Sequence, residues 1–264
     1  MTMIHPTAVI RDGAKIGKNN IIGPYCVISE NVVLGDNNNL QSHVVIDGNT
    51  TVGDENNFFP FACIGTKPQD LKYKGEPTRV NIGNNNTIRE YVTINASNGL
   101  EEDTNVGDNN LIMSYVHIAH NCQIGSNVII SSATTFAGHV HVLDHAIVSG
   151  MCAANQFVRI GRYAFVGGAS QIKKDIPPFT RGQGTDYHLG GINSIGLQRR
   201  GFSSETIAEI KEIFRIFYRS GLNVSQAVAQ AEELENLTDY QREFIEFAKS
   251  SERGIVLNSA GESS

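Results

Sequence analysis

The sequence lacks the features that mark several classes of protein. Tryptophan is absent, and the four cysteines, Cys26, Cys63, Cys122 and Cys152, form no CxxC pair or other metal-ligand spacing. We therefore expect free thiols in the core of a protein from a reducing compartment, with no metal site, and we expect the protein to be cytoplasmic.

Long apolar runs and an excess of positive charge are also missing. The opening residues, MTMIHPTAVI, contain neither a basic nor an apolar region typical of a secretory signal, and no run approaches a membrane span in length. The formal net charge is −6. This balance argues against wholesale nucleic-acid binding, because a surface that follows phosphates needs an excess of Lys and Arg. An acidic partner would have to dock on a local basic patch.

A period of six residues runs through the first two-thirds of the chain. Apolar residues recur at every sixth position over 4–64, 82–94 and 106–172, and glycine often follows them. A helix needs a period near 3.6 and an isolated strand a period of 2, so neither explains six. Three short strands joined by turns, each contributing one hexad to a triangular coil, do explain it. The pattern predicts an all-β left-handed parallel β-helix of hexapeptide repeats over residues 1–178.

Two stretches lose the apolar pattern. In residues 66–79 the register positions are Asp70 and Glu76, which cannot lie unpaired inside a dry prism. Residues 95–105, NASNGLEEDTN, have the composition of turns and surface. We expect both stretches to be loops that leave the prism, and loops on a rigid scaffold often carry binding residues.

After Pro177 and Pro178 the period ends, and residues 179–264 are expected to form a connector and a small α-helical domain. Residues 179–202 look irregular, and the tail from about residue 258 is expected to be disordered. Three helices are expected, which start at Ser203 or Ser204, at Ser225, and at Thr238 with Gln241 as a capping box.

Residues three hexads apart stack in one column of such a coil, and this locates a candidate site. His120, Gly138 and Gln156 form one column, with His139 beside the glycine and His117 one strand before His120. The outer two members of the column would lie about 10 Å apart, two coil spacings. The column offers an imidazole base, an uncovered glycine N–H for an oxyanion, and a polar side chain.

Two other groups of residues have alternative interpretations. His117, His139 and His141 could bind zinc around an open position, which would require a site between subunits because His139 and His141 are neighbours along one strand. The basic residues are either solvated surface or sites for a pyrophosphate and an acidic carrier protein. They are Lys67, Lys72, Lys74 and Arg79 in the first loop, Arg159, Arg162, Lys173 and Lys174 in the late coils, where we place carrier docking, and Arg199 and Arg200.

Several segments resemble the UDP-N-acetylglucosamine 3-O-acyltransferases that begin lipid A biosynthesis. The most specific are PQDLKYKGEPTR (68–79), HIAHNC (117–122), AGHV (137–140), NQF (155–157), DIPPF (175–179) and GINSIGLQRRGF (191–202). The resemblance covers nearly the whole chain. It implies a homotrimer with active sites between subunits, which moves a (3-hydroxy)acyl group from acyl carrier protein to the 3-hydroxyl of UDP-N-acetylglucosamine without a metal or cofactor.

The resemblance also implies roles for individual residues. His120 matches the general base, Gly138 the oxyanion donor, and Gly168 the ruler that limits acyl-chain length. The residues that match the nucleotide-sugar pocket are Gln69, Asp70, Lys72, His117, His139, Gln156, Asn193, Arg199 and Arg200.

Three asparagines depart from the family pattern. Asn121 stands where the family usually has Asp, and Asn95 and Asn155 stand where it usually has His. These departures keep two alternatives open: acylation of a related nucleotide (amino) sugar, and a nucleotide-sugar-binding module without catalysis. UDP-sugar binding without turnover would mark the second.

Overall fold

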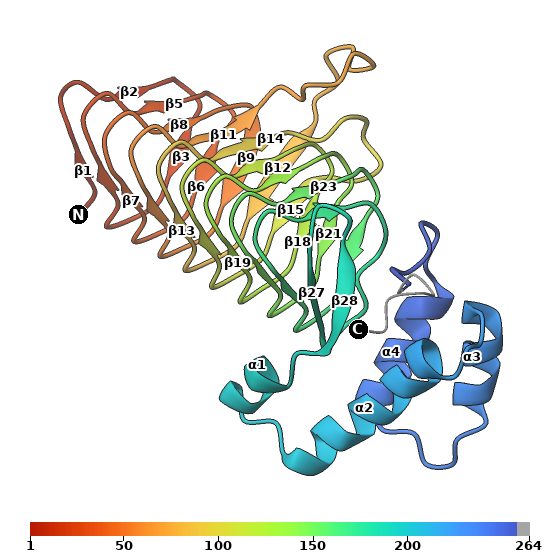
Figure 1. Cartoon of the computed structure of the whole chain (residues 1–264). Coiled ribbons are helices and arrows are strands. Elements are labelled where there is room, and N and C mark those ends of the chain that lie inside the picture. The colour runs from red at the N-terminus through yellow and green to blue at the C-terminus, as the bar shows by residue number, and fades with distance from the viewer. Residues whose placement is uncertain (258–264) are drawn as a thin grey trace.

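The computed structural model describes residues 1–257, and the tail expected to be disordered from about residue 258 lies outside this range. The chain winds into a triangular coil whose three sides form three sheets, and the helices gather at its C-terminal end (Figure 1). Successive coils pair in parallel, so that Met3 of the first coil lies beside Ile21 of the second. This arrangement confirms the predicted parallel β-helix.

Within residues 1–257 the three sheets, here named A, B and C, consist mostly of two-residue strands. Sheet A contains β1 (Met3–Ile4), β4 (Ile21–Ile22), β7 (Asn39–Leu40), β10 (Asn57–Phe58), β13 (Thr87–Ile88), β16 (Leu111–Ile112), β19 (Ile129–Ile130), β22 (Ile147–Val148), β25 (Phe165–Val166), β27 (Thr180–Gln183) and β28 (His188–Ile192). Sheet B contains β2 (Val9–Ile10), β5 (Val27–Ile28), β8 (Val45–Ile46), β11 (Cys63–Thr66), β14 (Thr93–Asn95), β17 (His117–Ile118), β20 (Thr135–Phe136), β23 (Ala153–Ala154) and β26 (Gln171–Ile172). Sheet C contains β3 (Lys15–Ile16), β6 (Val33–Leu34), β9 (Asn49–Val52), β12 (Arg79–Ile82), β15 (Thr104–Val106), β18 (Gln123–Ile124), β21 (His141–Val142) and β24 (Arg159–Ile160).

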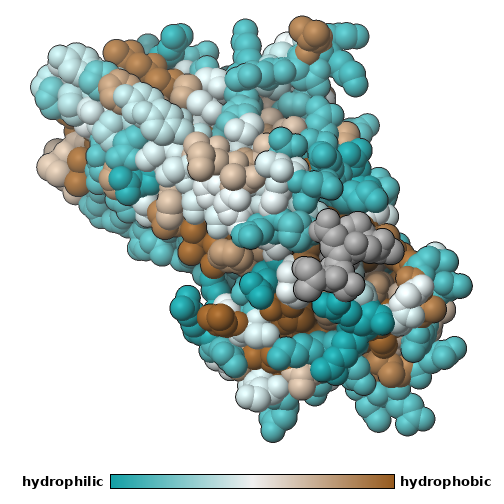
Figure 2. All heavy atoms as spheres, in the orientation of Figure 1, coloured by the Kyte–Doolittle hydropathy of each residue, from teal (hydrophilic) through white to brown (hydrophobic). Residues whose placement is uncertain are grey.

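The hexad residues fill the prism and glycines let its coils approach. Phe58 and Phe136 are fully buried, like most hexad positions. At the corner between sheets C and A, a Cβ on Gly17 would clash with the carbonyl oxygen of Gly35 in the next coil. The first coil has no coil before it, so Met3 and Ile4 stay exposed, and Figure 2 shows hydrophobic side chains at this end.

A column of buried asparagines supports the same corner, and the sequence analysis did not find it. Asn38 donates to the carbonyl of Gly53 at 2.9 Å, while its own Oδ1 accepts the backbone N–H of Asn56 at 2.9 Å. Asn20, Asn56, Asn86 and Asn110 repeat this pattern. Each amide therefore satisfies backbone groups that the turn leaves unpaired inside the prism.

Two coils are longer than the others. Asn39 pairs with Asn57 across a coil of ordinary length, but Asn57 pairs with Thr87 and Thr87 with Leu111, which lie further along the chain than three hexads. The extra residues lie in the segments 67–78 and 96–103, which both connect sheet B to sheet C. Because they leave adjacent coils at the same corner, these two loops lie next to each other. The longer one projects from the coil in Figure 1.

The connector is not irregular, and this expectation was wrong. Strands β27 and β28 form an antiparallel hairpin that continues sheet A beyond β25. Thr180, Gly182, Leu189 and Ile192 are buried in it. The hairpin has no six-residue period, so the repeat pattern could not reveal it.

Four helices follow in the described residues: α1 (Ser194–Arg199), α2 (Ser204–Arg219), α3 (Val224–Glu232) and α4 (Asp239–Lys249). Ser203 caps α2 and Thr238 forms the predicted capping box of α4 with Gln241. The predicted start of α3 at Ser225 was wrong: Asn223 caps it and forms a capping box with Gln226. No helix within residues 1–257 combines the length and apolarity needed to cross a membrane.

Candidate active site

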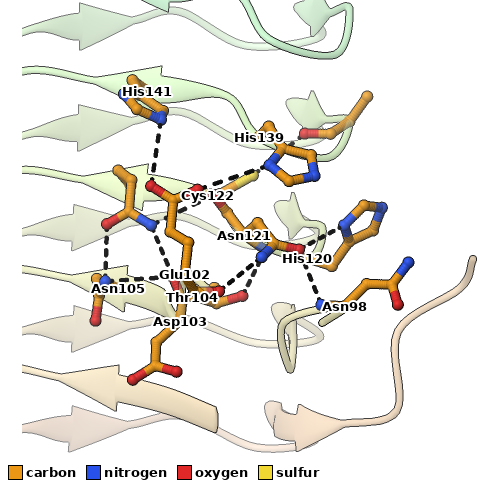
Figure 3. Close-up of polar contacts among 12 residues, drawn as sticks. Asn98, Glu102, Asp103, Thr104, Asn105, His120, Asn121, Cys122, His139 and His141 are labelled. Carbon is orange, nitrogen blue, oxygen red and sulfur yellow. Dashed lines mark hydrogen bonds and ion pairs between the residues drawn. The ribbon is translucent and has the colours of Figure 1, made fainter. Parts of the chain in front are cut away.

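The corner between sheets B and C carries most of the predicted site residues. His120 lies there between β17 and β18, one coil after the two loops. Gly138 and Gln156 occupy the same place in the next two coils. The predicted column therefore exists, and it faces the loops 67–78 and 96–103. Figure 3 shows His120 and His139 at this corner, with the side chains of loop 96–103 beside them.

The imidazole of His120 lies directly against Gly138. A Cβ on this glycine would lie 2.5 Å from Nε2 of His120, so a larger residue would displace the ring. Only 6% of His120 is exposed, and its Nδ1 lies 2.9 Å from Oδ1 of Asn121. The ring is thus fixed on one side by a glycine surface and on the other by a hydrogen bond.

The backbone N–H of Gly138 has no hydrogen-bond acceptor among the described residues, although the residue itself is buried beneath His120. Its neighbour His139 donates its own N–H to the carbonyl of His120 at 3.0 Å, but within residues 1–257 the N–H of Gly138 has no such acceptor. An N–H group beside an imidazole is the arrangement that acyl transfer needs, because the tetrahedral intermediate carries a negative oxygen near the base.

Asp70 approaches His120 from the first loop. Its Oδ2 lies 3.6 Å from Nε2 of His120. The backbone N–H of Lys72 and the amide of Asn98 donate to this carboxylate at 2.9 Å each. The hydrogen bond from Lys72 is the main reason that the pKa of Asp70 is lowered, so Asp70 is a carboxylate beside the imidazole.

The pKa values of the neighbouring histidines are lowered, which favours their neutral forms. Burial lowers the pKa of His117, and the nearby His120 lowers it further. Burial also lowers the pKa values of His139 and His141, which lie 3.6 Å and 3.9 Å from the carboxylate of Glu102 (Figure 3).

The zinc alternative gains no support from this geometry. The side chain of His117 bonds instead to Oγ1 of Thr93 at 2.7 Å, away from Glu102. Across residues 1–257 we find no group of three or more His, Cys, Asp or Glu side chains that could hold a metal ion.

Three predicted pocket residues have exposed side chains at this corner. Gln69 and Lys72 lie on the loop 67–78, and Gln156 lies beyond Gly138. All three therefore lie at the corner that carries His120.

A second group lies at another corner. The side chain of Asn193 accepts the backbone N–H of Gly196, which caps α1, and donates to the carbonyl of Tyr163. Both ends of this amide are therefore engaged in hydrogen bonds within the chain. Arg200 reaches His145, which lies between β21 and β22 at the corner of sheets C and A. Arg199 precedes it and is exposed. A single chain does not bring these residues together with His120.

The predicted ruler lies at the remaining corner. Gly168 sits between β25 and β26, where sheets A and B meet, and is exposed. A Cβ there would lie 3.4 Å from the carbonyl oxygen of Gly150, an ordinary contact, so a side chain would extend outward without strain.

The four basic residues predicted to dock a carrier protein divide into two pairs. Lys173 and Lys174 are exposed. Arg159 is bonded to Asp175 and to the carbonyl of Phe247, and Arg162 is paired with Glu243 on α4 at 2.6 Å. Both guanidinium groups therefore attach the helical domain to the last coils.

Two residues near His120 were missed by the sequence analysis. Asn98 and Glu102 come from the segment interpreted as turn and surface, and the side chain of Asn121 contacts both. The sequence gives no periodic signal for such contacts, because they join a loop to a later coil.

Comparison with known proteins places the chain in one family. Residues 175–256 match the family model described as UDP N-acetylglucosamine O-acyltransferase, domain 2, and residues 1–30, 13–48 and 103–138 match the bacterial transferase hexapeptide model. An acyl-[acyl-carrier-protein]–UDP-N-acetylglucosamine O-acyltransferase of Janthinobacterium sp. (strain Marseille) is 46% identical over 263 residues, which cover 97% of this chain and 100% of that protein. The chain belongs to the UDP-N-acetylglucosamine O-acyltransferase family.

Solved structures of the family have the same fold. The UDP-N-acetylglucosamine acyltransferase of Francisella novicida superposes with a TM-score of 0.95 at 41% identity, covering 98% of this chain and 95% of that one. The enzyme of Bacteroides fragilis superposes with a TM-score of 0.93 at 42% identity, covering 96% and 100%. Together with the hexapeptide match, these likenesses confirm the left-handed β-helix class with a small helical C-terminal region.

Proposed function

We propose that this protein transfers an acyl group from acyl carrier protein to the 3-hydroxyl of UDP-N-acetylglucosamine, the first step of lipid A biosynthesis. The observation that carries the proposal is His120 packed on Gly138, whose N–H has no acceptor among residues 1–257. Family membership supplies the substrates, since relatives of nearly equal length are named for this reaction.

The proposed mechanism uses two groups at the corner. Nε2 of His120 takes the proton of the 3-hydroxyl as its oxygen attacks the thioester carbonyl. The N–H of Gly138 donates to the oxyanion that forms. The C–S bond then breaks, and His120 gives its proton to the departing sulfur, so that the carrier leaves as a thiol.

The charges of the site suit this sequence of events. His120 becomes an imidazolium while the oxyanion forms, and the carboxylate of Asp70, 3.6 Å from Nε2, stabilises that positive charge. A well-placed base contributes about 10²–10⁴ in rate, and one oxyanion donor about 10²–10³.

We further propose a homotrimer with sites between subunits. His120 and Arg200 lie at opposite edges of sheet C. If both contact one UDP-sugar, a second copy of the chain must supply the arginine. Measuring the molar mass in solution by light scattering tests the trimer, and a monomer of full activity would contradict it.

The acyl chain is proposed to cross the outer face of sheet B toward Gly168. Thr135 and Ala153 project from this face, and both are small and exposed. They leave a path between the corner of His120 and the corner of Gly168. The exposed Lys173 and Lys174 are the proposed contacts for the carrier protein, whereas Arg159 and Arg162 have partners in the chain.

The donor thioester is already activated, so we propose that no metal or cofactor takes part. A chelator should therefore leave turnover unchanged.

We also place the protein in the cytoplasm, because its four cysteines are free and three of them are buried.

Turnover tests the proposal directly. Purified protein is mixed with UDP-N-acetylglucosamine and a panel of plain and 3-hydroxyacyl carrier proteins, and products are identified by mass spectrometry. We expect a singly acylated UDP-sugar whose acyl group is released by mild base, as an ester is, and no product with His120→Ala. A base-stable product from the corresponding amino sugar would show that the acceptor is an amine, and UDP-sugar binding without any product would mark a binding module. Normal turnover by His120→Ala would place the base elsewhere.

A further inference from the structure

Loop 96–103 is fastened at both ends to a single side chain, that of Asn121. The backbone N–H of Asn98 donates to Oδ1 of Asn121 at 2.9 Å. Nδ2 of Asn121 donates to the carbonyl of Glu102 at 2.6 Å. Asn121 is 2% exposed and has a φ of +58°, a conformation that asparagine tolerates well. The buried amide thus holds the loop against the corner, together with Gln123, whose Nε2 donates to the carbonyl of Asp103 at 2.7 Å (Figure 3).

These two backbone partners decide which way the amide points. A peptide N–H can only donate and a carbonyl can only accept. The atom of Asn121 facing Asn98 must therefore be the oxygen, and the atom facing Glu102 must be the NH₂ group. Flipping the amide, so that its oxygen and nitrogen exchange places, would put two donors together at one end of the loop and two acceptors together at the other.

The same oxygen decides the tautomer of His120. It lies 2.9 Å from Nδ1, and because it accepts only, Nδ1 must carry the proton. The neutral ring then has its lone pair on Nε2, the atom that faces Asp70. This is the tautomer that can remove a proton from a hydroxyl.

We propose that loop 96–103 is a positioning element for the base: its backbone fixes the amide of Asn121, and the amide fixes His120 as the Nδ1–H tautomer. The inference rests on the proposed role of His120 and adds to it. It also explains a departure from the family, which usually has Asp at position 121. A carboxylate has no proton to donate to the carbonyl of Glu102, so with this loop an aspartate would face an oxygen at 2.6 Å.

The tautomer can be observed without turnover, by ¹⁵N NMR of protein labelled in histidine, with the signals of His120 assigned by their loss in His120→Ala. We expect a protonated Nδ1 and an unprotonated Nε2 in the unmodified protein. Asn121→Gly keeps the positive φ but removes the amide, so we expect a mixture of tautomers. Asn121→Asp keeps an acceptor for Nδ1–H and should keep the tautomer. A wild-type protein with the proton on Nε2, or an unchanged tautomer in Asn121→Gly, would overturn the proposal.

Backbone hydrogen exchange reports how firmly loop 96–103 is held. Exchange of residues 96–103 should rise in Asn121→Asp, which loses the donor to Glu102, and rise further in Asn121→Gly, which also loses the acceptor for Asn98. Asn98→Ala is the matched control, because it removes only the side-chain bond to Asp70 and keeps the N–H. It should leave the tautomer of His120 unchanged. Equal exchange in Asn121→Asp and the unmodified protein would refute the attachment at Glu102.

Steady-state kinetics distinguish a positioning role of Asn121 from a purely structural one. Asn121→Gly should lower kcat about 10²-fold with little change in KM, the lower end of the range for losing a positioned base. Asn121→Asp should recover part of kcat, and the acid limb of its rate–pH profile should move to higher pH, because a carboxylate stabilises the imidazolium. Equal kcat values for the two variants would count against the proposal. Failure of the proposed base would show differently: His120→Ala would turn over normally while the NMR and exchange results stood.

Discussion

Adding one methyl group at Gly138 should disable the site by displacing His120, without removing any group that reacts. In Gly138→Ala the new Cβ would lie 2.5 Å from Nε2 of His120, whereas ordinary contacts begin near 3.4 Å. The corner backbone is held by hydrogen bonds to the coils on both sides, including His139 N–H to His120 and Phe157 N–H to Gly138. The imidazole must therefore move, by roughly 1 Å.

The effect of a displacement of this size on the reaction rate has a known order of magnitude. A misplacement of about 1 Å costs on the order of 10² in rate, equivalent to roughly 2.7 kcal/mol. The backbone N–H of Gly138 remains, so the loss should appear in kcat and in the single-turnover rate. The free energy of unfolding should fall by about 1–3 kcal/mol, as for other crowded sites.

The assay compares Gly138→Ala with Gly190→Ala in single-turnover reactions with acyl carrier protein and UDP-N-acetylglucosamine. Gly190 is an exposed control, where a Cβ would lie 3.7 Å from its nearest neighbour, the carbonyl oxygen of Arg181. The control should react at the normal rate. If Gly138→Ala also reacts within twofold of the unmodified protein, His120 tolerates the displacement and cannot be the base.

Three further predictions concern the ruler, the domain junction and acid stability. Gly168→Met should favour acyl chains at least two methylenes shorter, by roughly 15-fold at about 0.8 kcal/mol per methylene, and an unchanged chain profile would refute the ruler. Arg159→Leu should lower the unfolding free energy by about 3–5 kcal/mol, because Asp175 is only 1% exposed and would lose its charged partner, keeping hydrogen bonds only from Ser251 and a backbone N–H; thermal unfolding beside the exposed control Arg253→Leu checks this. Hydrogen bonds from Arg89 lower the pKa of Glu90 to about 2, so Glu90→Gln should be less stable than the unmodified protein above pH 4.5, and the gap should close as the pH falls toward 2. A gap independent of pH, measured by denaturant unfolding, would contradict the assignment.

The repeat could be read from the sequence because each coil needs the same residues. An apolar residue must enter the prism once per strand, and this requirement is local, so it survives in the hexad pattern. The column of His120, Gly138 and Gln156 followed from the three-hexad coil alone. The caps Ser203 and Thr238 were also local signals, since the cap and its partner lie within one helical turn.

Contacts between distant segments could not be read in this way. Arg162 on a late coil meets Glu243 on α4, and the sequence offers only two charges among many. The hairpin β27–β28 depends on docking against β25, not on its own pattern. Arg159 and Arg162 were therefore expected to bind a partner, although the helical domain already engages both.

The loops were predicted, but their chemistry was not. Residues 96–103 look like solvated surface because Glu101, Glu102 and Asp103 are charged. Their backbone, however, bonds to Asn121 and Gln123 of the following coil. Side chains alone gave no sign of this, because backbone groups carry no sequence signature.

The three asparagine departures from the family do not have equal weight. Asn121 is matched to loop 96–103, so its neutral amide replaces a carboxylate without leaving His120 free to rotate. Asn95 is buried and donates to Thr66, but its Oδ1 has no partner among the described residues. Asn155 is exposed beside Gln156 and makes no side-chain hydrogen bond within residues 1–257. Because its side chain has no hydrogen-bond partner within residues 1–257, Asn155 is where a changed contact to sugar or acyl chain is best tested. Asn155→His should alter KM or chain preference, while leaving the tautomer of His120 as it is.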